Sequence, residues 1–322
     1  MSKMKILIAY DGSSFSDAAL DDLLRAGLPS KAEALVVSVS EVFVPVASHA
    51  GLVPALPGAE ILLQEKNDAL ELAQSAGQRI NQRFPDWIVK AQGYAGSTVM
   101  EILTEADQWQ PDLIVIGSHG RSSLSRFFLG SVTMSVLHGA RCPVRVVRGD
   151  VRPDQTAIRN IVGVDGSPFG AAVIRSVTSR EWPADAEFRV VACYGPFRRQ
   201  IEPGVSEPEK LFAEKIQKEA VARLRTAGLN TSGKVFLDDP RHALIEEADA
   251  WKADCIFVGA RGLSAFERIL LGSVSSKVAG HAPCSVEVVR YPEKVVNNDT
   301  SRLNIPSGPP ALVELPFQLR MM

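Results

Sequence analysis

Short apolar runs alternate with amphipathic stretches along the first half of the chain. Residues 4–10 form a nearly continuous apolar run, which is typical of a strand buried on both faces of a sheet. Residues 14–26 instead place apolar side chains at helical spacing, with Ser13 or Ser14 as the expected N-cap. The pattern continues with expected strands at 34–39, 87–93, 113–116 and 144–147, and with expected helices at 60–84, 97–109 and 132–139. In the helix at 97–109, Ser97 or Thr98 is the expected cap, and with Thr98 as the cap Glu101 would complete a capping box.

This βαβαβαβαβ order predicts an α/β fold, a parallel sheet with helices on both faces and right-handed crossovers. In such sheets, ligands bind beyond the carboxyl ends of the strands, where the strand order reverses. Asp11 and Gly117 each follow a predicted strand directly. We therefore expect both residues on that edge of the sheet.

The second half of the chain repeats the first. Residues 112–148 align with residues 254–290 without gaps at an offset of 142, and 17 of these 37 positions are identical. Residues 8–15 align with residues 162–169 at an offset of 154, so the second copy is 12 residues shorter between its front and its back. A period of this size indicates a duplicated domain, and a length of 322 residues also favours two domains.

Proline, glycine and polar residues mark the expected boundaries. The length difference is assigned to the Pro/Gly-rich segment 42–58, which is typical of a long loop. We expect a first domain over residues 1–149, a linker over 150–160, a second domain over 161–290 and a Pro-rich, poorly ordered tail over 291–322.

Composition narrows the class of protein. The formal net charge is −2, so no basic excess favours nucleic acid as a partner. No apolar run is long enough to span a bilayer, and the first apolar stretch is too short for a signal peptide. These features predict a cytoplasmic protein without a membrane partner. No CxxC motif or histidine cluster accompanies the cysteines, so we expect reduced, buried thiols at Cys142, Cys193, Cys255 and Cys284.

A glycine-rich segment carries the candidate chemistry. Residues 117–131 follow the pattern Gly-x2-Gly-x9-Gly-Ser between a predicted strand end and a predicted helix start. The glycines are expected to adopt φ > 0 and let the backbone approach a ligand. The helix start offers free N–H groups and the positive end of the helix dipole to phosphate oxygens. The candidate phosphate contacts are Gly117, Gly120, Gly130, Ser131, Val132 and Thr133.

The segment differs from two familiar nucleotide-binding motifs. It lacks the Gly-Lys-Ser/Thr of a Walker A loop, and a GxGxxG dinucleotide fingerprint would follow the first strand. The alternative is an ordinary strand–loop–helix connection, which the recurrence of the pattern in the second copy disfavours. The second copy offers Gly259, Gly262, Gly272, Ser273, Val274 and Ser275 at the same spacing.

The front motif Ala9-Tyr10-Asp11-Gly12-Ser13 and the back motif Gly117-Ser-His-Gly120…Gly130-Ser131-Val132-Thr133 resemble the ATP-binding branch of the universal stress protein family. The resemblance covers residues 3–290 and excludes the tail. It implies two tandem Rossmann-like (adenine-nucleotide-hydrolase-like) domains, each with a five-stranded parallel sheet. It also implies that the domains pair through their last strands as a pseudo-dimer, while association of whole chains into a homodimer stays open.

The same resemblance implies ATP, alone or with Mg²⁺, as the ligand of a regulatory module in the stress response. Asp11 would contact the adenosine part, and Val39 would meet adenine through its backbone. In the first copy the implied contacts are Ala9, Tyr10, Asp11, Val39, Gly117, His119, Gly120, Arg121, Gly130, Ser131, Val132 and Thr133. In the second copy they are Val164, Asp165, Tyr194, Gly259, Arg261, Gly262, Gly272, Ser273, Val274 and Ser275.

Three functions stay open at this point. A regulatory ATP-binding protein is favoured over a slow ATPase or nucleotidyl transferase, because no nucleophile–base set or carboxylate pair accompanies the loop. His119 lacks a carboxylate partner at local spacing, so a role in shaping the loop is favoured over general base catalysis. The intact glycines argue against a scaffold without nucleotide. The second copy is the weaker candidate, because Arg261, Leu263 and Ser275 replace His119, Arg121 and Thr133.

Overall fold

The computed structural model describes residues 3–42, 58–120, 129–148, 157–195, 207–262 and 271–290, which all belong to one compact unit, Met1–Arg290. The predicted tail, most of the predicted linker and most of the predicted long loop lie outside the described residues.

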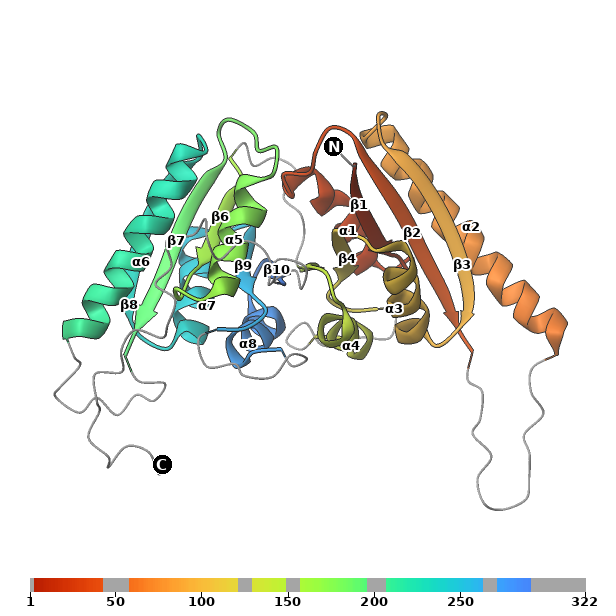
Figure 1. Cartoon of the computed structure of the whole chain (residues 1–322). Helices are drawn as coiled ribbons and strands as arrows, with labels where there is room; N and C mark the ends of the chain where they lie inside the picture. The colour runs from red at the N-terminus through yellow and green to blue at the C-terminus, as the bar shows by residue number, and fades with distance from the viewer. Residues whose placement is uncertain are drawn as a thin grey trace, which may run out of the picture. The chain divides into compact units, whose positions relative to one another are not determined.

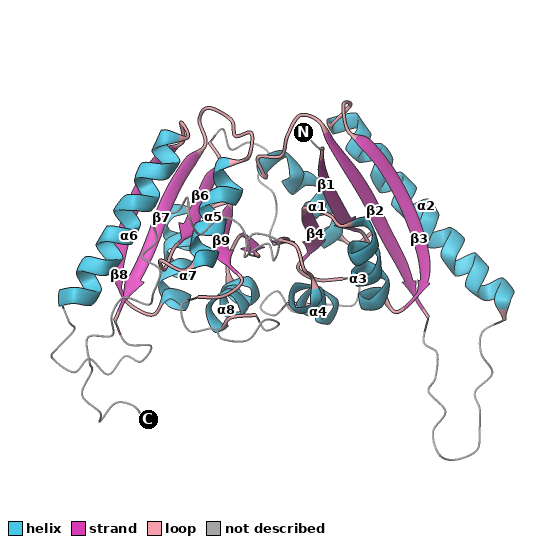
Figure 2. Ribbon diagram, viewed as in Figure 1, coloured by secondary structure: helices cyan, strands magenta, loops and turns pink. Residues whose placement is uncertain are grey.

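The first copy shows the predicted alternation of strands and helices in its described part (Figures 1 and 2). Its elements are β1 (Met4–Ala9), α1 (Ser14–Asp22), the 3₁₀ helix η1 (Leu23–Arg25), β2 (Ala32–Glu41), α2 (Ala59–Arg83), β3 (Ile88–Gly96), α3 (Thr98–Trp109), β4 (Leu113–Gly117), α4 (Ser131–Gly139) and β5 (Val144–Val147).

The second copy repeats this order, and its first strand begins inside the segment expected to be a linker. Its elements are β6 (Arg159–Gly163), α5 (Pro168–Thr178), β7 (Glu187–Tyr194), α6 (Glu207–Thr226), β8 (Asn230–Leu237), α7 (Pro240–Trp251), β9 (Cys255–Gly259), α8 (Ser273–His281) and β10 (Ser285–Val289).

The two copies share one ten-stranded sheet with the order β3-β2-β1-β4-β5-β10-β9-β6-β7-β8. Strands within each copy pair in parallel, whereas β5 and β10 pair antiparallel and join the copies. The parallel sheet and the pairing through the last strands are therefore confirmed. In each copy the first strand lies between the second and the fourth, so the strand order reverses there.

Helices cover both faces of the sheet, as the apolar patterns predict. In the first copy, α1 and α2 pack on one face through residues such as Leu20 and Ile80. On the other face, α3 and α4 pack against a core that continues into α7 and α8 of the second copy through residues such as Leu137 and Val278. This shared core joins the copies into one unit.

The N-cap of α1 is one of the two serines that the sequence predicts, whereas the capping box considered for α3 does not form. The Ser13 side chain accepts a hydrogen bond from the Ser16 N–H at 3.2 Å, which confirms Ser13 as the N-cap of α1. In α3 the N-cap is Ser97, and it makes no side-chain cap bond. Glu101 therefore stands one position too late in the helix to complete a capping box.

A matched pair of arginines ties each copy to the other. Arg148 follows β5 and donates to the carbonyl oxygens of Ala279 and Gly280 at 3.1 and 2.9 Å, near the end of α8. Its counterpart Arg290 follows β10 and donates to the carbonyl oxygen of Leu137 near the end of α4. Burial lowers the pKa of both guanidinium groups. Each arginine supplies donors and positive charge to carbonyl groups that a helix end leaves unpaired.

We expect Arg148→Met to lower the free energy of unfolding by about 1–2 kcal/mol, because two carbonyl groups lose a charged donor. Urea unfolding at 25 °C measures the loss. The control is Arg141→Met, whose side chain is 77% exposed in an ion pair with Asp107, and it should leave stability within about 0.5 kcal/mol. Equal stability of the two variants would contradict the role assigned to Arg148.

The cysteines are free, as predicted, although only two are fully enclosed. Cys255 and Cys284 are buried, whereas Cys142 and Cys193 are half-buried. Burial raises the pKa of the Cys142, Cys193 and Cys255 thiols to about 12. A thiol with a raised pKa has a smaller thiolate fraction, and the thiolate is the reactive form.

We therefore expect the folded chain to react with thiol reagents at pH 8 slower than the urea-unfolded chain by about a hundredfold or more. Absorbance-monitored labelling of both states measures the ratio. Rapid labelling of one equivalent in the folded state would contradict the expectation.

None of the helices in the described part of the chain is long and apolar enough to cross a membrane.

Candidate functional site

The reversal of strand order brings the front and back motifs of each copy together. β1 pairs directly with β4, and Ala9 lies opposite Ile116 at their carboxyl ends. Asp11 follows β1, and Gly117 ends β4. The expectation that these two residues share one edge of the sheet is confirmed, and the edge lies at the point where ligands bind in such sheets.

The aspartate after the first strand is held by its own turn. Asp11 Oδ1 accepts hydrogen bonds from the Ser13 N–H at 3.0 Å and from the Ser13 hydroxyl at 2.6 Å. A Cβ atom added to Gly120 would lie 3.0 Å from Asp11 Oδ2. Asp11 and the second glycine of the loop are therefore in close contact, although 109 positions separate them in the sequence.

The second copy repeats this contact. Asp165 Oδ1 accepts from the Ser167 N–H at 2.9 Å, and a Cβ atom on Gly262 would lie 2.7 Å from Asp165 Oδ2. A larger residue at Gly262 would collide with the carboxylate. Both copies therefore preserve the same aspartate–glycine contact.

The expected conformation of the loop glycines is wrong. Gly130 and Gly272 have φ of −61° and −69°, and Gly117 and Gly120 are absent from the described glycines with positive φ. The left-handed residues at this edge are instead the glycines after the two aspartates, Gly12 at φ 74° and Gly166 at φ 80°.

Close packing explains the first glycine of each loop. A Cβ atom on Gly117 would lie 2.8 Å from the carbonyl group of Phe15 in α1. A Cβ atom on Gly259 would lie 2.7 Å from Phe169 Cβ in α5. These two glycines let the helix lie against the strand end, which a single sequence does not distinguish from close approach of a ligand.

His119 and Arg261 occupy matching places beside these phenylalanines. His119 is 5% exposed, and its ring lies 4.9 Å from the ring of Phe15. Its Nδ1 and the Ser118 hydroxyl are 3.1 Å apart. In the second copy the guanidinium of Arg261 lies 6.0 Å from the ring centre of Phe169. The packing of His119 agrees with a role in shaping the loop.

Hydrogen bonds close the base of the loop in both copies. The Gly130 N–H donates to the Ser118 carbonyl at 2.8 Å, and the Thr133 hydroxyl donates to the Gly117 carbonyl at 2.8 Å. Thr133 is buried, and its hydroxyl group donates to this main-chain carbonyl rather than to a ligand. In the second copy the Gly272 N–H and the Ser275 hydroxyl both donate to the Ala260 carbonyl, at 2.8 and 3.0 Å.

The helix behind each loop begins with an uncapped turn. Gly130 and Gly272 are the N-caps of α4 and α8, and the structure shows no side-chain cap bond at either. Side chains cap α1, α5 and α7, through Ser13, Ser167 and Asp239. The first turns of α4 and α8 thus begin with main-chain N–H groups that their N-cap residue cannot cap, at the positive end of the helix dipole. These turns contain Ser131, Val132 and Thr133 in α4, and Ser273, Val274 and Ser275 in α8.

Tyr10 turns its side chain away from this edge. Its hydroxyl donates to Asp17 Oδ1 at 2.7 Å and accepts from Arg79 at 3.2 Å, on the side of the sheet covered by α1 and α2. Burial and the Asp17 hydrogen bond raise its pKa to about 12. Ala9 and Val164 are also buried, so these three positions offer only main-chain atoms to a ligand.

The sheet register corrects one equivalence between the copies. Val39 lies in β2, opposite Tyr94 of β3. The Tyr10 N–H donates to the Val37 carbonyl, and the Val164 N–H donates to the Val191 carbonyl, so the offset of 154 holds through this strand. Cys193, rather than Tyr194, is therefore the counterpart of Val39.

Some predicted site residues are not described. Arg121 lies outside the described residues, as do the rest of segment 121–128 and the whole of segment 263–270.

One cluster at the start of α7 is not among the predicted site residues. Among the described residues, Asp238, His242 and Glu246 bring three potential cation ligands within 4.8 Å of one another. The two imidazole nitrogens of His242 each face one of the carboxylates at 2.7 Å. The arrangement is that of a histidine held between two carboxylates, and it lies at the end of β8 in the second copy rather than at the edge formed by Asp11 and Gly117.

Comparisons with known proteins agree with the duplication. Residues 3–148 and 158–290 each match the universal stress protein family. A universal stress protein of Mycolicibacterium smegmatis is 30% identical over 307 residues, which cover 88% of this chain and 96% of that protein. Universal stress protein YxiE of Bacillus subtilis is 34% identical over 149 residues, which cover 45% of this chain and 98% of that protein. The crystal structure of a universal stress protein from Archaeoglobus fulgidus has a similar fold, with a TM-score of 0.64, 20% identity and coverage of 90% of this chain and 99% of that one.

Proposed function

The chain belongs to the universal stress protein family, and we propose that each copy binds ATP at the edge formed by Asp11 and Gly117 or by Asp165 and Gly259. The observation that carries the proposal is a loop that holds its second glycine against an aspartate and ends in a helix whose N-cap is a glycine without a capping side chain. An anion satisfies such N–H groups, and the aspartate accepts hydrogen bonds from the neutral part of the same ligand.

The phosphate end of the ligand is assigned to the helix start. The main-chain N–H groups of Ser131, Val132 and Thr133 would donate to phosphate oxygens, and the exposed Ser131 hydroxyl would add a further donor. The buried Thr133 hydroxyl would act indirectly, by holding the base of the loop against Gly117. Ser273, Val274 and Ser275 would act in the same way in the second copy.

The adenosine end is assigned to the front motif and the second strand. Asp11 or Asp165 would accept a hydrogen bond from the sugar, and the main chain at Val39 or Cys193 would meet the base. A Mg²⁺ ion would bind through the phosphate oxygens, as it commonly does when few protein carboxylates are available.

The proposed role is binding that regulates partners, rather than catalysis. In the described part of this edge, the hydroxyls of Thr133 and Ser275 are bonded to main-chain carbonyls, and His119 packs on Phe15. These contacts hold the loop in shape. The Ser118 hydroxyl lies 3.1 Å from His119 Nδ1, but Ser118 is fully buried, so this pair presents no nucleophile to a ligand.

Identification of bound nucleotide tests the proposal. The purified full chain is denatured, and released nucleotides are separated and identified by mass. Titration calorimetry of the nucleotide-free chain with ATP, with and without Mg²⁺, then gives the stoichiometry. We expect ATP in the released fraction and two ATP per chain in the titration. Absence of nucleotide, together with no thermal shift in Mg-ATP, would contradict the proposal.

GTP and inorganic phosphate are the matched ligands for this experiment. GTP carries the same triphosphate and a different base, so it separates recognition of adenine from binding of phosphate. Release of ADP over many turnovers would instead identify an ATPase.

A further inference from the structure

The strands that join the two copies carry buried charges of opposite sign. In the antiparallel pair of β5 and β10, Arg145 lies directly opposite Glu287. Both side chains are fully buried, and Arg145 Nη1 lies 3.4 Å from Glu287 Oε2. At the repeat offset of 142, Arg145 and Glu287 are also equivalent positions of the two copies. The copies therefore differ in charge sign at the position where they face each other.

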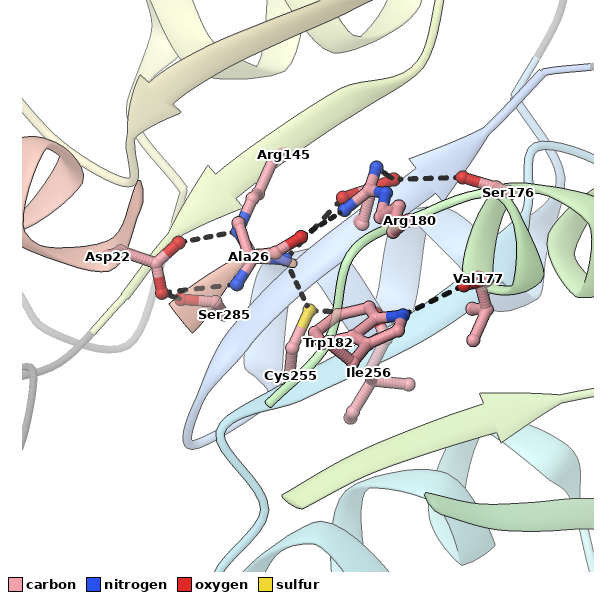
Figure 3. A network of polar contacts seen from close by, with 11 residues as sticks. Asp22, Ala26, Arg145, Ser176, Val177, Arg180, Trp182, Cys255, Ile256 and Ser285 are labelled. Atoms are coloured by element: carbon pink, nitrogen blue, oxygen red, sulfur yellow. Dashed lines mark hydrogen bonds and ion pairs between the residues drawn. The ribbon is translucent and has the colours of Figure 1, made fainter. Parts of the chain in front are cut away.

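Each of these charges has a second partner in its own copy, and Figure 3 shows Asp22 beside Arg145. The Arg145 guanidinium donates to Asp22 through Nε, and through Nη2 at 3.2 Å. Arg180 donates to Glu287 Oε1. Asp22, Arg145, Glu287 and Arg180 thus alternate in sign from the first copy to the second. Burial opposes the charge on Arg145, but the two carboxylates outweigh it and hold its pKa well above the ordinary value.

Two more hydrogen bonds cross the interface, and in both the donor belongs to the second copy and the acceptor to the first. The Ser285 hydroxyl donates to Asp22 Oδ1 at 3.1 Å, and Arg180 Nη1 donates to the Ala26 carbonyl at 2.8 Å. In the other copy, Pro143 stands at the position of Ser285, and Ala26 itself stands at the position of Arg180. Neither of these side chains has a hydrogen-bond donor, so the contacts require one copy of each kind.

We propose that this arrangement selects pairing between a first copy and a second copy, and rejects pairing between two identical copies. Two first copies that met through β5 would place Arg145 against Arg145. Two second copies that met through β10 would place Glu287 against Glu287. Like charges would then be buried at the centre of the interface, where no water screens them. The face of β5 therefore fits the β10 face of a second copy, which this chain supplies itself.

One ion pair across the interface does not discriminate. Arg25 lies 2.8 Å from Asp254 of the second copy. The equivalent of Asp254 in the first copy is Asp112, so two first copies would form the same ion pair. The central charges and the contacts of Ser285 and Arg180, by contrast, differ between the copies and therefore contribute to the selection.

Disulfide trapping in the full chain distinguishes the pairings. Val146 faces Val286 here, and Val144 faces Val288. Since Val286 and Val288 are the equivalents of Val144 and Val146, two paired first copies would bring Val144 of one chain opposite Val146 of the other. A chain with Val144→Cys and Val146→Cys therefore reports pairing of identical copies between chains. A chain with Val146→Cys and Val286→Cys reports the pairing seen here.

Both reporter chains are refolded from urea at high concentration, oxidised and compared on non-reducing gels, with the chain that has only its own cysteines as control. With native charges, we expect an intrachain disulfide from the second reporter and single chains from the first. A neutral background should raise the interchain product of the first reporter by about tenfold or more, because the like-charge barrier is gone. That background combines Asp22→Asn, Arg145→Met, Arg180→Met and Glu287→Gln.

The matched control removes the same number of charges within single copies. It combines Asp17→Asn, Arg79→Met, Arg189→Met and Glu247→Gln. These changes remove three ion pairs that do not cross the interface, Asp17–Arg79, Arg189–Glu247 and Lys234–Glu247. This control should leave the interchain product at the native level.

Two results would overturn the proposal. One is an interchain disulfide from the native-charge chain as abundant as the intrachain one. The other is a neutral chain that folds, by circular dichroism, without a rise in interchain product. Where the neutral chain does not refold, Glu287→Gln alone with Val286→Cys and Val288→Cys applies the same test to two second copies, and an unchanged yield overturns the proposal.

Discussion

A chain that carries Gly130→Val and Gly272→Val is expected to bind ATP more weakly by about 100-fold or more at both sites. A Cβ atom on Gly130 would lie 3.3 Å from the Ser118 carbonyl oxygen and 3.4 Å from His119 Cα, so valine would have no room at the base of the loop. The loss corresponds to about two charge-assisted hydrogen bonds of about 1.5 kcal/mol each between phosphate and the helix start. Titration calorimetry with ATP measures the change.

The fold should survive this substitution. Gly130 and Gly272 have φ near −65°, which valine adopts without strain, and both residues lie at the start of a helix rather than in the core. The control is Gly58→Val at the N-cap of α2, where an added Cβ atom meets nothing within 4 Å. Circular dichroism should show native helix content for all variants.

Each single variant tests ATP binding at one of the two sites. Gly130→Val should leave one ATP per chain, bound in the second copy, and Gly272→Val should leave one ATP bound in the first. Unchanged affinity in the double variant would show that the helix starts do not hold the phosphates, even if the chain still binds nucleotide elsewhere.

The hydrophobic pattern predicts the elements well and their ends less well. The predicted strand at 34–39 lies within β2, and the one at 87–93 begins one residue before β3, but both observed strands extend further, to Glu41 and Gly96. Main-chain pairing continues between Glu41 and Gly96 after the apolar side chains have ended. Hydrogen bonds of a parallel ladder need no apolar side chain, so hydropathy underestimates the length of such strands.

The most important buried charge could not be found from one copy of the sequence. Arg145 stands in the strand Val144–Val147, where a single arginine resembles an exposed position. Its burial depends on Asp22, which lies 123 positions earlier, and on Glu287, which lies 142 positions later. The fold brings these groups together, and no local spacing encodes their contact.

The candidate site also combines features that the sequence predicts with features that only the fold determines. The repeat predicts which aspartate and which glycines share an edge, because it marks the same positions twice. The packing of Phe15 against Gly117 and of Phe169 against Gly259 joins parts of the chain that no local pattern connects. The sequence also does not show that the positive φ values fall on Gly12 and Gly166.

Arg145→Met is expected to lower the free energy of unfolding by about 3–5 kcal/mol, the largest single-residue effect on stability that we predict. The methionine fills much of the same space, but Asp22 and Glu287 stay buried with one positive partner fewer. Asp22 would keep only the Ser285 hydroxyl among its hydrogen bonds described above. Urea unfolding at pH 7 and 25 °C measures the loss.

Arg79→Met is the matched control, because Arg79 also pairs with an aspartate, Asp17, but both side chains are more than one-third exposed. Solvent screens that pair, so its loss should cost about 1 kcal/mol or less. The added change Glu287→Gln should not restore the stability of Arg145→Met fully, because Asp22 still lacks its partner. Adding Asp22→Asn should recover more, since a buried carboxylate without a counter-charge is the costly group. A loss of less than about 1 kcal/mol for Arg145→Met would show that water or backbone groups replace the guanidinium, and that the buried charges do not hold the two copies together.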